Sequence, residues 1–304
     1  MGYILMTKLK NLCLIIVFTT FIHSSAVFAQ NSVKLMSWNI EWLASQSGST
    51  PIQAKRTEND YQKLAEYFST TQPDILAFQE INDIKAIQKV VGSDYAIILS
   101  DRADQSFRSN QFNGINQYTG FAVNKAFTVS NRKDLILDSR PSSKLRFASY
   151  LVVETESNQT LHLLSVHLKA GCSGRFKSSN NCHILKKQGE ELNDWIRKMD
   201  KQNQNYMVLG DFNHNLSYPK DWLWEILVKG SRSKLATYHT KAECKVRSRK
   251  NPNKTHQFRS LIDHIIVSPS IETNKPVQTV FTSHDVLTHK LSDHCPLNIE
   301  ISLP

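Results

Sequence analysis

The sequence predicts an α/β protein folded as one large domain. Apolar runs of strand character alternate with helical signals along the chain, an alternation typical of the α/β class. Helices are expected over residues 53–70, 83–91, 185–199 and 219–228. No internal repeat or low-complexity linker divides the chain. About 275 residues beyond a leader are enough for a single hydrophobic core.

Short acidic or histidine-bearing segments follow one another along the chain. They are SWNIEWL at 37–43, FQE at 78–80, SVHLK at 165–169, GDFN at 210–213, LIDHIIVS at 261–268 and SDH at 292–294. Most continue an apolar, strand-like run and end in polar residues, which places those side chains at the ends of buried strands. One such segment arises easily by chance, whereas six together indicate a functional site.

Two of these strand ends carry oxygen ligands for a hard divalent metal ion. Asn39 ends the run VKLMSWN, and Glu80 ends DILAFQE. Mg²⁺ takes oxygen ligands and keeps several waters when one or two carboxylates hold it, and Mn²⁺ or Ca²⁺ are alternatives. Such an ion neutralises a phosphodiester and lowers the pKa of bound water. Taken singly, each residue is better explained as a strand cap, and only the two together favour a metal site.

The segment GDFN is a strand that emerges into a turn. Gly210 permits close backbone approach, and Asp211 and Asn213, two residues apart, project toward one face. The alternative is an Asx-turn, in which the two side chains bond their own backbone.

In their order and residues, the six segments resemble the active-site set of the endonuclease/exonuclease/phosphatase family, which includes deoxyribonucleases. The resemblance spans roughly residues 33–301 and implies a four-layer α/β sandwich, with two mixed β-sheets packed face to face and helices on the outside. It also implies that Asp211 activates the attacking water and that the Asn213 amide donates to a phosphate oxygen. Asp293 is then a further metal ligand beside Asn39 and Glu80.

The same resemblance assigns roles to two histidines. His294 would contact the scissile phosphate or relay a proton, with Asp263 as the carboxylate that orients its ring and raises its pKa. His167 matches a second histidine of the deoxyribonuclease-like branch, suited to protonating the leaving oxygen. By strand alternation His264 points away from Asp263, so we expect it to be structural, as we do His162.

Substrate-binding residues are predicted from charge and from a looser resemblance. The formal net charge is +10, and +8 without the leader, which favours polyanionic partners. Arg247, Arg249 and Lys250 lie in a basic stretch and are expected to contact nucleic acid; the alternative is a solvated face. Tyr118 resembles a family tyrosine near the phosphate, and a core role is the alternative.

The N-terminus has the features of a secretory signal peptide over residues 1–29. Two lysines precede an apolar stretch from Leu12 to Ile22, and small residues lead to a cleavage site expected after Ala29. The apolar stretch is too short for a permanent anchor, and no later segment suits a membrane span. We therefore expect a secreted or periplasmic monomer with its catalytic domain over 30–304, without a membrane anchor or a protein partner.

Four cysteines remain after removal of the leader. An even count in an oxidising compartment favours two disulfides, and three pairings are open. We favour Cys172 with Cys182 and Cys244 with Cys295. The competing use, zinc binding, finds no matching spacing.

Together these features predict an exported, metal-dependent nuclease that hydrolyses DNA, with RNA as an alternative. A phosphatase or phosphodiesterase acting on sphingomyelin, inositol phosphates or another small phosphorylated substrate would use the same phosphate and metal centre. A non-catalytic module that binds nucleic acid or a host protein is the alternative from another class. Loss of a motif residue would support it, but none is lost.

Overall fold

The computed structural model describes residues 32–46, 52–155 and 159–304. The signal peptide predicted over residues 1–29 lies outside the described residues. Within the described part of the chain, no helix has both the length and the apolar character needed to cross a membrane.

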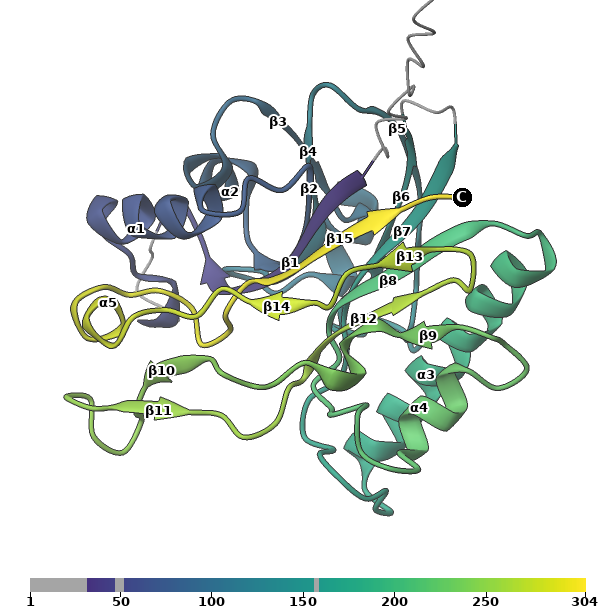
Figure 1. The fold of residues 1–304 in the computed structure, drawn as a ribbon. Helices are drawn as coiled ribbons and strands as arrows, with labels where there is room; N and C mark the ends of the chain where they lie inside the picture. Colours follow the sequence, from purple (N-terminus) through teal and green to yellow (C-terminus); the bar gives the residue numbers. More distant parts are fainter. Residues whose placement is uncertain (1–31, 47–51, 156–158) are drawn as a thin grey trace, which may run out of the picture. The chain divides into compact units, whose positions relative to one another are not determined.

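The described strands form two large sheets and a short ribbon (Figure 1). The first sheet has the order β13-β15-β1-β2-β4-β3, and β14 also pairs with β15. Its strands are β1 (Ser32–Leu43), β2 (Ile75–Ile81), β3 (Tyr95–Leu99), β4 (Tyr118–Asn124), β13 (Glu272–Thr273), β14 (Val277–Gln278) and β15 (Leu297–Ser302). It is mixed, because β1 and β2 are parallel and their other neighbours are antiparallel.

The second sheet has the order β5-β6-β7-β8-β12-β9 and is also mixed, with β7 parallel to β8. Its strands are β5 (Thr128–Leu135), β6 (Ala148–Glu154), β7 (Thr160–His167), β8 (Asn205–Asp211), β9 (Lys234–Leu235) and β12 (Asp263–Val267). The ribbon pairs β10 (Lys245–Arg247) with β11 (Thr255–Gln257).

The four predicted helices are present but differ in their ends, and a fifth, α5, was not predicted. The α-helices are α1 (Glu58–Ser69), α2 (Ile84–Val91), α3 (Asn180–Lys201), α4 (Trp222–Leu227) and α5 (Ser283–Thr288), and the 3₁₀ turns are η1 (Ile52–Ala54), η2 (Asp101–Ala103), η3 (Gln105–Asn110) and η4 (Ala236–His239). The prediction over 53–70 began too early, because Thr57 forms a capping box with Asp60 and starts α1 there. Ser179 caps α3 several residues before the predicted start at 185.

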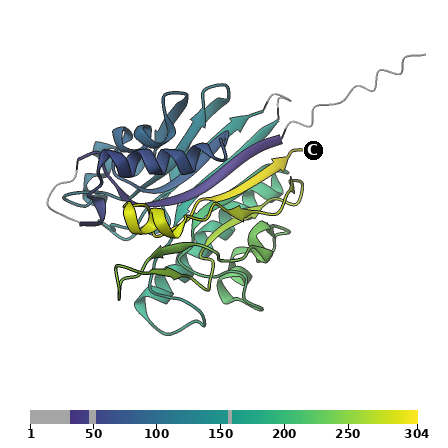
Figure 2. The ribbon, with the colours of Figure 1, turned by 60° about the vertical axis from the view of Figure 1, so that its left-hand side comes forward.

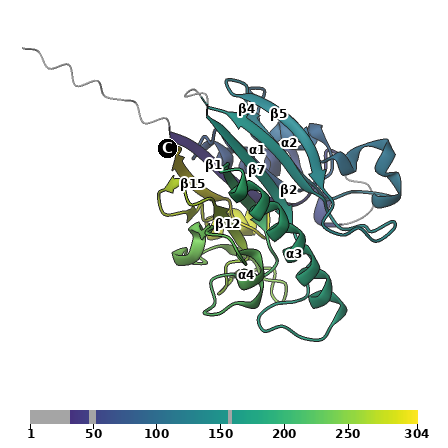
Figure 3. The same cartoon turned by 90° about the vertical axis from the view of Figure 1, so that its right-hand side faces the viewer.

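Three apolar cores define four layers, which confirms the predicted sandwich. One core joins the facing sides of the two sheets, where Leu35 and Ala77 meet Leu163 and Leu209. A second packs α1 and α2 on the outer face of the first sheet, and a third packs α3 and α4 on the outer face of the second. Figure 2 shows the two helical layers on opposite sides of the sheets, and Figure 3 shows α3 along the second sheet.

The two disulfides have the predicted pairing. Cys172–Cys182 closes the loop between β7 and α3. Cys244–Cys295 joins the start of the β10–β11 ribbon to the residue that follows His294. This second bridge fixes a basic hairpin next to one of the predicted catalytic residues. Disulfides of this kind are typical of proteins folded in an extracellular or periplasmic compartment.

Gly210 meets a steric requirement between β7 and β8. Its φ of +144° lies in a region that side-chain-bearing residues rarely adopt, and a Cβ there would lie 2.0 Å from the carbonyl oxygen of Val166. The opposing atom belongs to the backbone of the paired strand, so the clash cannot be relieved by a rotamer change. A glycine is needed at this position to bring Asp211 beside His167.

We therefore expect Gly210→Ala to lower the free energy of unfolding by about 3 kcal/mol, measured by urea denaturation. Gly114→Ala is the matched control, because a Cβ at Gly114 meets no atom within 4 Å. The control is expected to stay within about 0.5 kcal/mol of the parent. Equal stability of the two variants would contradict the steric account.

Candidate active site

The predicted residues converge where the ends of two pairs of parallel strands meet, β1 with β2 and β7 with β8. Asn39 lies near the end of β1, Glu80 near the end of β2, His167 ends β7 and Asp211 ends β8. Residues His167 and Asp211 pair across β7 and β8, and Asp263 pairs with Asp211 at the start of β12. The face-to-face packing of the two sheets brings the side chains from β1 and β2 next to those from β7, β8 and β12.

Irregularities in strand pairing direct the side chains of the first sheet toward the cluster. The pairing of β1 with β2 is irregular between Asn39 and Leu43, and that of β2 with β4 shifts around Glu80. Glu41, Trp42 and Glu80 have positive φ values of 38°, 55° and 62°. Bulges and strained backbone of this kind re-aim side chains at functional sites.

Asn39, Glu80 and Asp211 form the centre of the cluster. The Asn39 Nδ2 donates to Glu80 Oε1 at 3.3 Å and to Asp211 Oδ2 at 3.1 Å. Its Oδ1 accepts from the backbone N–H of Glu41. Asn39 and Asp211 are almost fully buried. Burial, together with the charges of Asp263 and Glu80, raises the pKa of Asp211 to about 7.

His294 is held between two carboxylates. Its Nδ1 lies 2.8 Å from Asp263 Oδ2, and its Nε2 lies 3.7 Å from Asp211 Oδ2. Burial opposes a charge on the ring, but the charges of Asp263 and Asp211 outweigh it and hold the pKa of His294 well above its usual range. The imidazolium form is therefore favoured in the free protein.

His167 lies on the opposite side of the same carboxylates. Its Nε2 is 3.6 Å from Glu80 Oε1 and 3.5 Å from Asp211 Oδ2, while its buried Nδ1 has no partner among the described residues. Burial and the nearby charges of Arg146 and His294 hold the pKa of His167 well below its usual range. The two histidines therefore differ in charge, with His294 protonated and His167 neutral.

Asn213 combines the two arrangements considered from sequence. Its backbone N–H donates to Asp211 Oδ1 at 2.7 Å, as in an Asx-turn. Its side-chain Nδ2 lies 3.2 Å from Asp211 Oδ2 and 3.1 Å from the carbonyl oxygen of Leu168. The turn thus places the Asn213 amide against the Asp211 carboxylate.

Of the other predicted residues, all of which the structure describes, Asp293 and Arg249 adjoin this cluster, whereas Tyr118, Arg247 and Lys250 contact none of its members. Asp293 Oδ1 is 3.8 Å from His294 Nε2, and its Oδ2 accepts from Arg249 at 3.5 Å. Tyr118 is buried at the start of β4, with the Arg102 guanidinium 5.4 Å from its ring centroid. On the ribbon, Arg247 bonds the Pro252 carbonyl, and Lys250 lies in the connecting turn.

His264 and His162 lie apart from this cluster. His264 is fully buried, accepts a bond from the Leu216 backbone and bonds Thr237. His162 bonds Tyr150 and Gln204. Each ring has polar partners of its own on both nitrogens, and none of these partners belongs to the carboxylate cluster.

Two residues of the site were missed from sequence. Burial and the neighbouring charge of Asp293 raise the pKa of Glu41 to about 7, and Glu80 adds to this effect. Arg146 donates to the Leu168 carbonyl at 3.1 Å, while its buried Nε has no partner among the described residues. Burial lowers the pKa of Arg146, and the charges of Glu80 and Asp211 act against that shift.

The available signals for these two residues were weak. Glu41 stands in the SWNIEWL segment, two residues after Asn39, so that spacing was a usable sign. Arg146 lies outside every motif, just before β6.

The donor set fits a hard divalent cation. Carboxylate oxygens of Asp211 and Asp263 lie within 4.8 Å of each other and of a ring nitrogen of His294, which as an imidazolium would not itself be a ligand. Glu80 and Asp211 share one amide donor, and crowding of negative charge raises the pKa of Asp211. A divalent ion would relieve this repulsion and satisfy oxygen ligands that it prefers.

A model of the endonuclease/exonuclease/phosphatase family matches residues 36–294. The chain belongs to this family, whose members are phosphoesterase hydrolases that typically depend on a divalent metal. The match includes all six segments, while residues 1–35 and 295–304, with the start of β1 and all of β15, lie outside it. No curated protein sequence matches the chain significantly.

Solved structures of the same family share the fold. An endonuclease/exonuclease/phosphatase from Bacteroides vulgatus has a TM-score of 0.63 at 15% identity, covering 90% of this chain and 99% of its own. A mannosyl-6-phosphatase from Bacteroides thetaiotaomicron has a TM-score of 0.62 at 14% identity, covering 89% and 100%. The catalytic domain of human nocturnin has a TM-score of 0.60 at 17% identity, covering 90% and 96%. At these identities the likeness establishes the fold.

The pairing of His294 with Asp263 yields a prediction about protonation. Asp263→Asn removes a negative charge 2.8 Å from Nδ1, so the pKa of His294 should fall toward its ordinary value of about 6.5. The measurement is a pH titration of the ring protons by NMR in metal-free protein. His162, which is remote from Asp263, serves as the internal control and should titrate unchanged. An unaltered His294 would show that Asp263 does not set its charge.

Proposed function

We propose that this protein is an exported, divalent-metal-dependent nuclease that hydrolyses phosphodiester bonds of DNA, with RNA as an alternative nucleic acid. The observation that carries the proposal is the cluster of buried carboxylates with one protonated and one neutral histidine, beside an exposed basic ribbon. Membership of the family supports hydrolysis of phosphate esters as the reaction. The ribbon and the net charge of +10 supply the argument for a polyanionic substrate.

Mg²⁺ is the proposed cofactor, with Mn²⁺ or Ca²⁺ as alternatives. Glu80 and Asn39 would hold it, with Asp293 as a further ligand. When bound, the ion neutralises phosphate charge and stabilises the leaving oxygen. Asn39 now presents its Nδ2 to the carboxylates, so an amide that serves as a ligand would present Oδ1 instead.

The protein's own groups would divide the remaining work. Asp211, whose pKa of about 7 suits proton transfer near neutrality, orients the attacking water and accepts its proton. The His294 imidazolium, fixed by Asp263, offers a positive N–H to the phosphate. The Asn213 amide and the unpartnered Nε of Arg146 offer further donors at the same centre. His167 faces the other side, where the leaving oxygen takes its proton; a bound phosphate would favour the charged ring.

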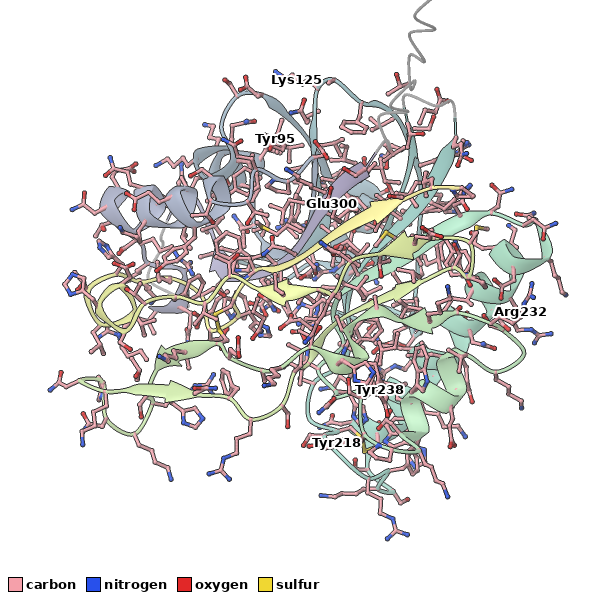
Figure 4. The ribbon with its side chains drawn as sticks, viewed as in Figure 1. Tyr95, Lys125, Tyr218, Arg232, Tyr238 and Glu300 are labelled. Carbon is pink, nitrogen blue, oxygen red and sulfur yellow. A yellow bond between two sulfur atoms is a disulfide. The ribbon has the colours of Figure 1, made fainter. Side chains whose placement is uncertain are left out.

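Nucleic acid is favoured over a small substrate by the position of the ribbon. The Cys244–Cys295 bridge and the Arg249–Asp293 contact bring the ribbon to the rim of the site. The Arg249 side chain is nevertheless 91% exposed, and the long ribbon side chains extend away from the body of the domain (Figure 4). Exposed cations beside a phosphate-binding centre suit a substrate that extends beyond it, as a polynucleotide does.

A small phosphorylated substrate is the second candidate. The similarity to the mannosyl-6-phosphatase of Bacteroides thetaiotaomicron supports it, because that structure shares the fold over its whole length. Sphingomyelin and inositol phosphates are also within this class. A non-catalytic binding module is disfavoured because every predicted catalytic side chain is present and reaches the cluster.

The proposal includes export and a monomeric state. Residues 1–29 are proposed to be removed as a signal peptide, leaving a catalytic domain over 30–304. The two disulfides support an oxidising destination.

We expect Glu80→Gln and Asp211→Asn each to reduce hydrolysis of plasmid DNA with Mg²⁺ by about 100-fold or more, since each removes charge without changing volume. Glu300→Gln, on β15 and away from the site, is the matched control (Figure 4). Circular dichroism should show all three variants folded. Near-parental turnover by either site variant, on DNA and on a small phosphodiester, would overturn the assignment.

Neutralising Arg247, Arg249 and Lys250 to glutamine should weaken DNA binding and flatten its salt dependence. Each lost phosphate contact reduces the log–log slope by about one unit for duplex DNA. Hydrolysis of a small chromogenic phosphodiester should be unchanged. The measurement is affinity at several salt concentrations for parent and variant.

The matched control replaces Arg197, Lys198 and Lys201, near the C-terminal end of α3, with glutamine. This replacement removes the same number of positive charges. That variant should keep the slope of the parent. An equal loss on DNA and on the small diester would mean that the ribbon supports the fold or His294. Unchanged DNA binding by the ribbon variant would favour a small-molecule phosphatase.

A further inference from the structure

Trp42 occupies a backbone conformation that favours glycine. Its φ of 55° is left-handed, as is that of its neighbour Glu41, where β1 bulges away from β2. The Trp42 N–H donates to Glu80 Oε2 at 3.1 Å, which fixes this backbone against the proposed metal ligand. A bulky residue in this region is strained, and its ring is only half-buried, so core packing does not account for it.

A second aromatic side chain faces Trp42 across the bulge. The ring centroids of Trp42 and Phe112 lie 6.3 Å apart with an interplanar angle of 39°. Phe112 follows η3 and is also half-buried. Two partly exposed rings, from segments far apart in sequence, thus meet beside the strand end that carries Glu80.

The loop that carries Phe112 is rigidly held. The buried Asn116 side chain accepts from the Phe112 N–H and donates to the carbonyls of Phe112 and Gly114. The Asn116 N–H donates to Asn82 Oδ1 at 2.7 Å, two residues beyond Glu80. The loop is therefore tied to the same bulged strand as the proposed metal ligand.

A buried cation backs the Phe112 ring. The Arg102 guanidinium lies 5.4 Å from the Phe112 ring centroid and bonds the carbonyls of Asn110 and Gln117. Arg102 is fully buried, so the backing is fixed. A wall ordered in advance loses little conformational entropy when a ligand stacks on it.

We propose that Trp42 and Phe112 form a stacking subsite for the nucleobase that adjoins the scissile phosphate. This inference rests on the proposed nuclease function and deepens it. The left-handed strain at Trp42 is retained because the ring is needed at the rim of the site. Aromatic faces stack every base, so the subsite gives affinity for nucleic acid without sequence preference.

Single-stranded oligonucleotides that carry one abasic residue test the subsite. In the parent enzyme, an abasic residue next to the cleaved bond should raise KM about tenfold, with little change in kcat. In Trp42→Gly, the intact and abasic substrates should have the same KM. Trp42→Phe keeps a ring and should retain most of the difference. Glycine adopts φ 55° without strain, so Tm of Trp42→Gly shows whether the fold is intact.

A binding measurement separates failure of this inference from failure of the proposed function. In Asp211→Asn protein with Mg²⁺, thymidine 5′-phosphate should quench tryptophan fluorescence and bind about tenfold more tightly than deoxyribose 5-phosphate. Adding Trp42→Phe should remove most of the quenching, whereas Trp224→Phe, on α4, should leave it. The binding measurement proceeds even if no nucleic acid is cleaved.

The outcomes are decisive in both directions. Preference for the base-bearing ligand that disappears in Trp42→Gly supports the subsite, whatever polymer the enzyme cleaves. Equal binding of the two phosphates by folded protein overturns it, as does an abasic effect that persists unchanged in folded Trp42→Gly. Absence of cleavage of any nucleic acid, with base-dependent binding intact, would leave the subsite standing and refute the nuclease proposal alone.

Discussion

Burial of Asp211 among other charged groups is the constraint on which the site depends. Its carboxylate lies within 4 Å of side chains from two other strand ends, Asn39 and His167, and from two loops, Asn213 and His294. Burying negative charge is costly unless it is paired or hydrogen-bonded. The Asn39 amide and the His294 imidazolium partly offset this cost, but the pKa of Asp211 still rises to about 7. A divalent cation would supply the remaining compensation.

Several features of the fold hold the partners of Asp211 in place. Gly210 allows β7 and β8 to approach closely enough to pair His167 with Asp211. The Ser292 hydroxyl donates to the Asn39 carbonyl, and the Trp38 indole donates to the His294 carbonyl, which ties the loop that carries His294 to β1. The Cys244–Cys295 bridge fixes the same loop from the other side. His294 is thus positioned by contacts from β1, β12 and the ribbon.

The sequence revealed the strand ends but not the bulges between them. Asn39, Glu80, Asp211 and Asp263 each end or begin an apolar run, so periodicity was enough to find them. Glu41 and Trp42 follow Asn39 in a segment where regular alternation would send one side chain to each face. The β1 bulge breaks that alternation, and its cause is pairing with β2, a neighbour more than thirty residues away in the chain. The predicted starts of α1 and α3 were also wrong for a local reason. Side-chain caps at Thr57 and Ser179 set where these helices begin, whereas the prediction relied on hydrophobic periodicity.

The residues proposed for the reaction and those proposed for substrate recognition lie in different parts of the fold. Most of the groups proposed to handle phosphate and metal stand at the ends of paired strands, where register fixes their spacing. The groups that would meet the rest of the substrate stand on the ribbon, on the Phe112 loop and on the β1 bulge, which tolerate change without disturbing the cores. Arg249 and Trp42 approach opposite members of the cluster, Asp293 and Glu80. A substrate that contacts both would extend across the proposed metal centre, which fits the proposed polynucleotide better than a single small phosphate.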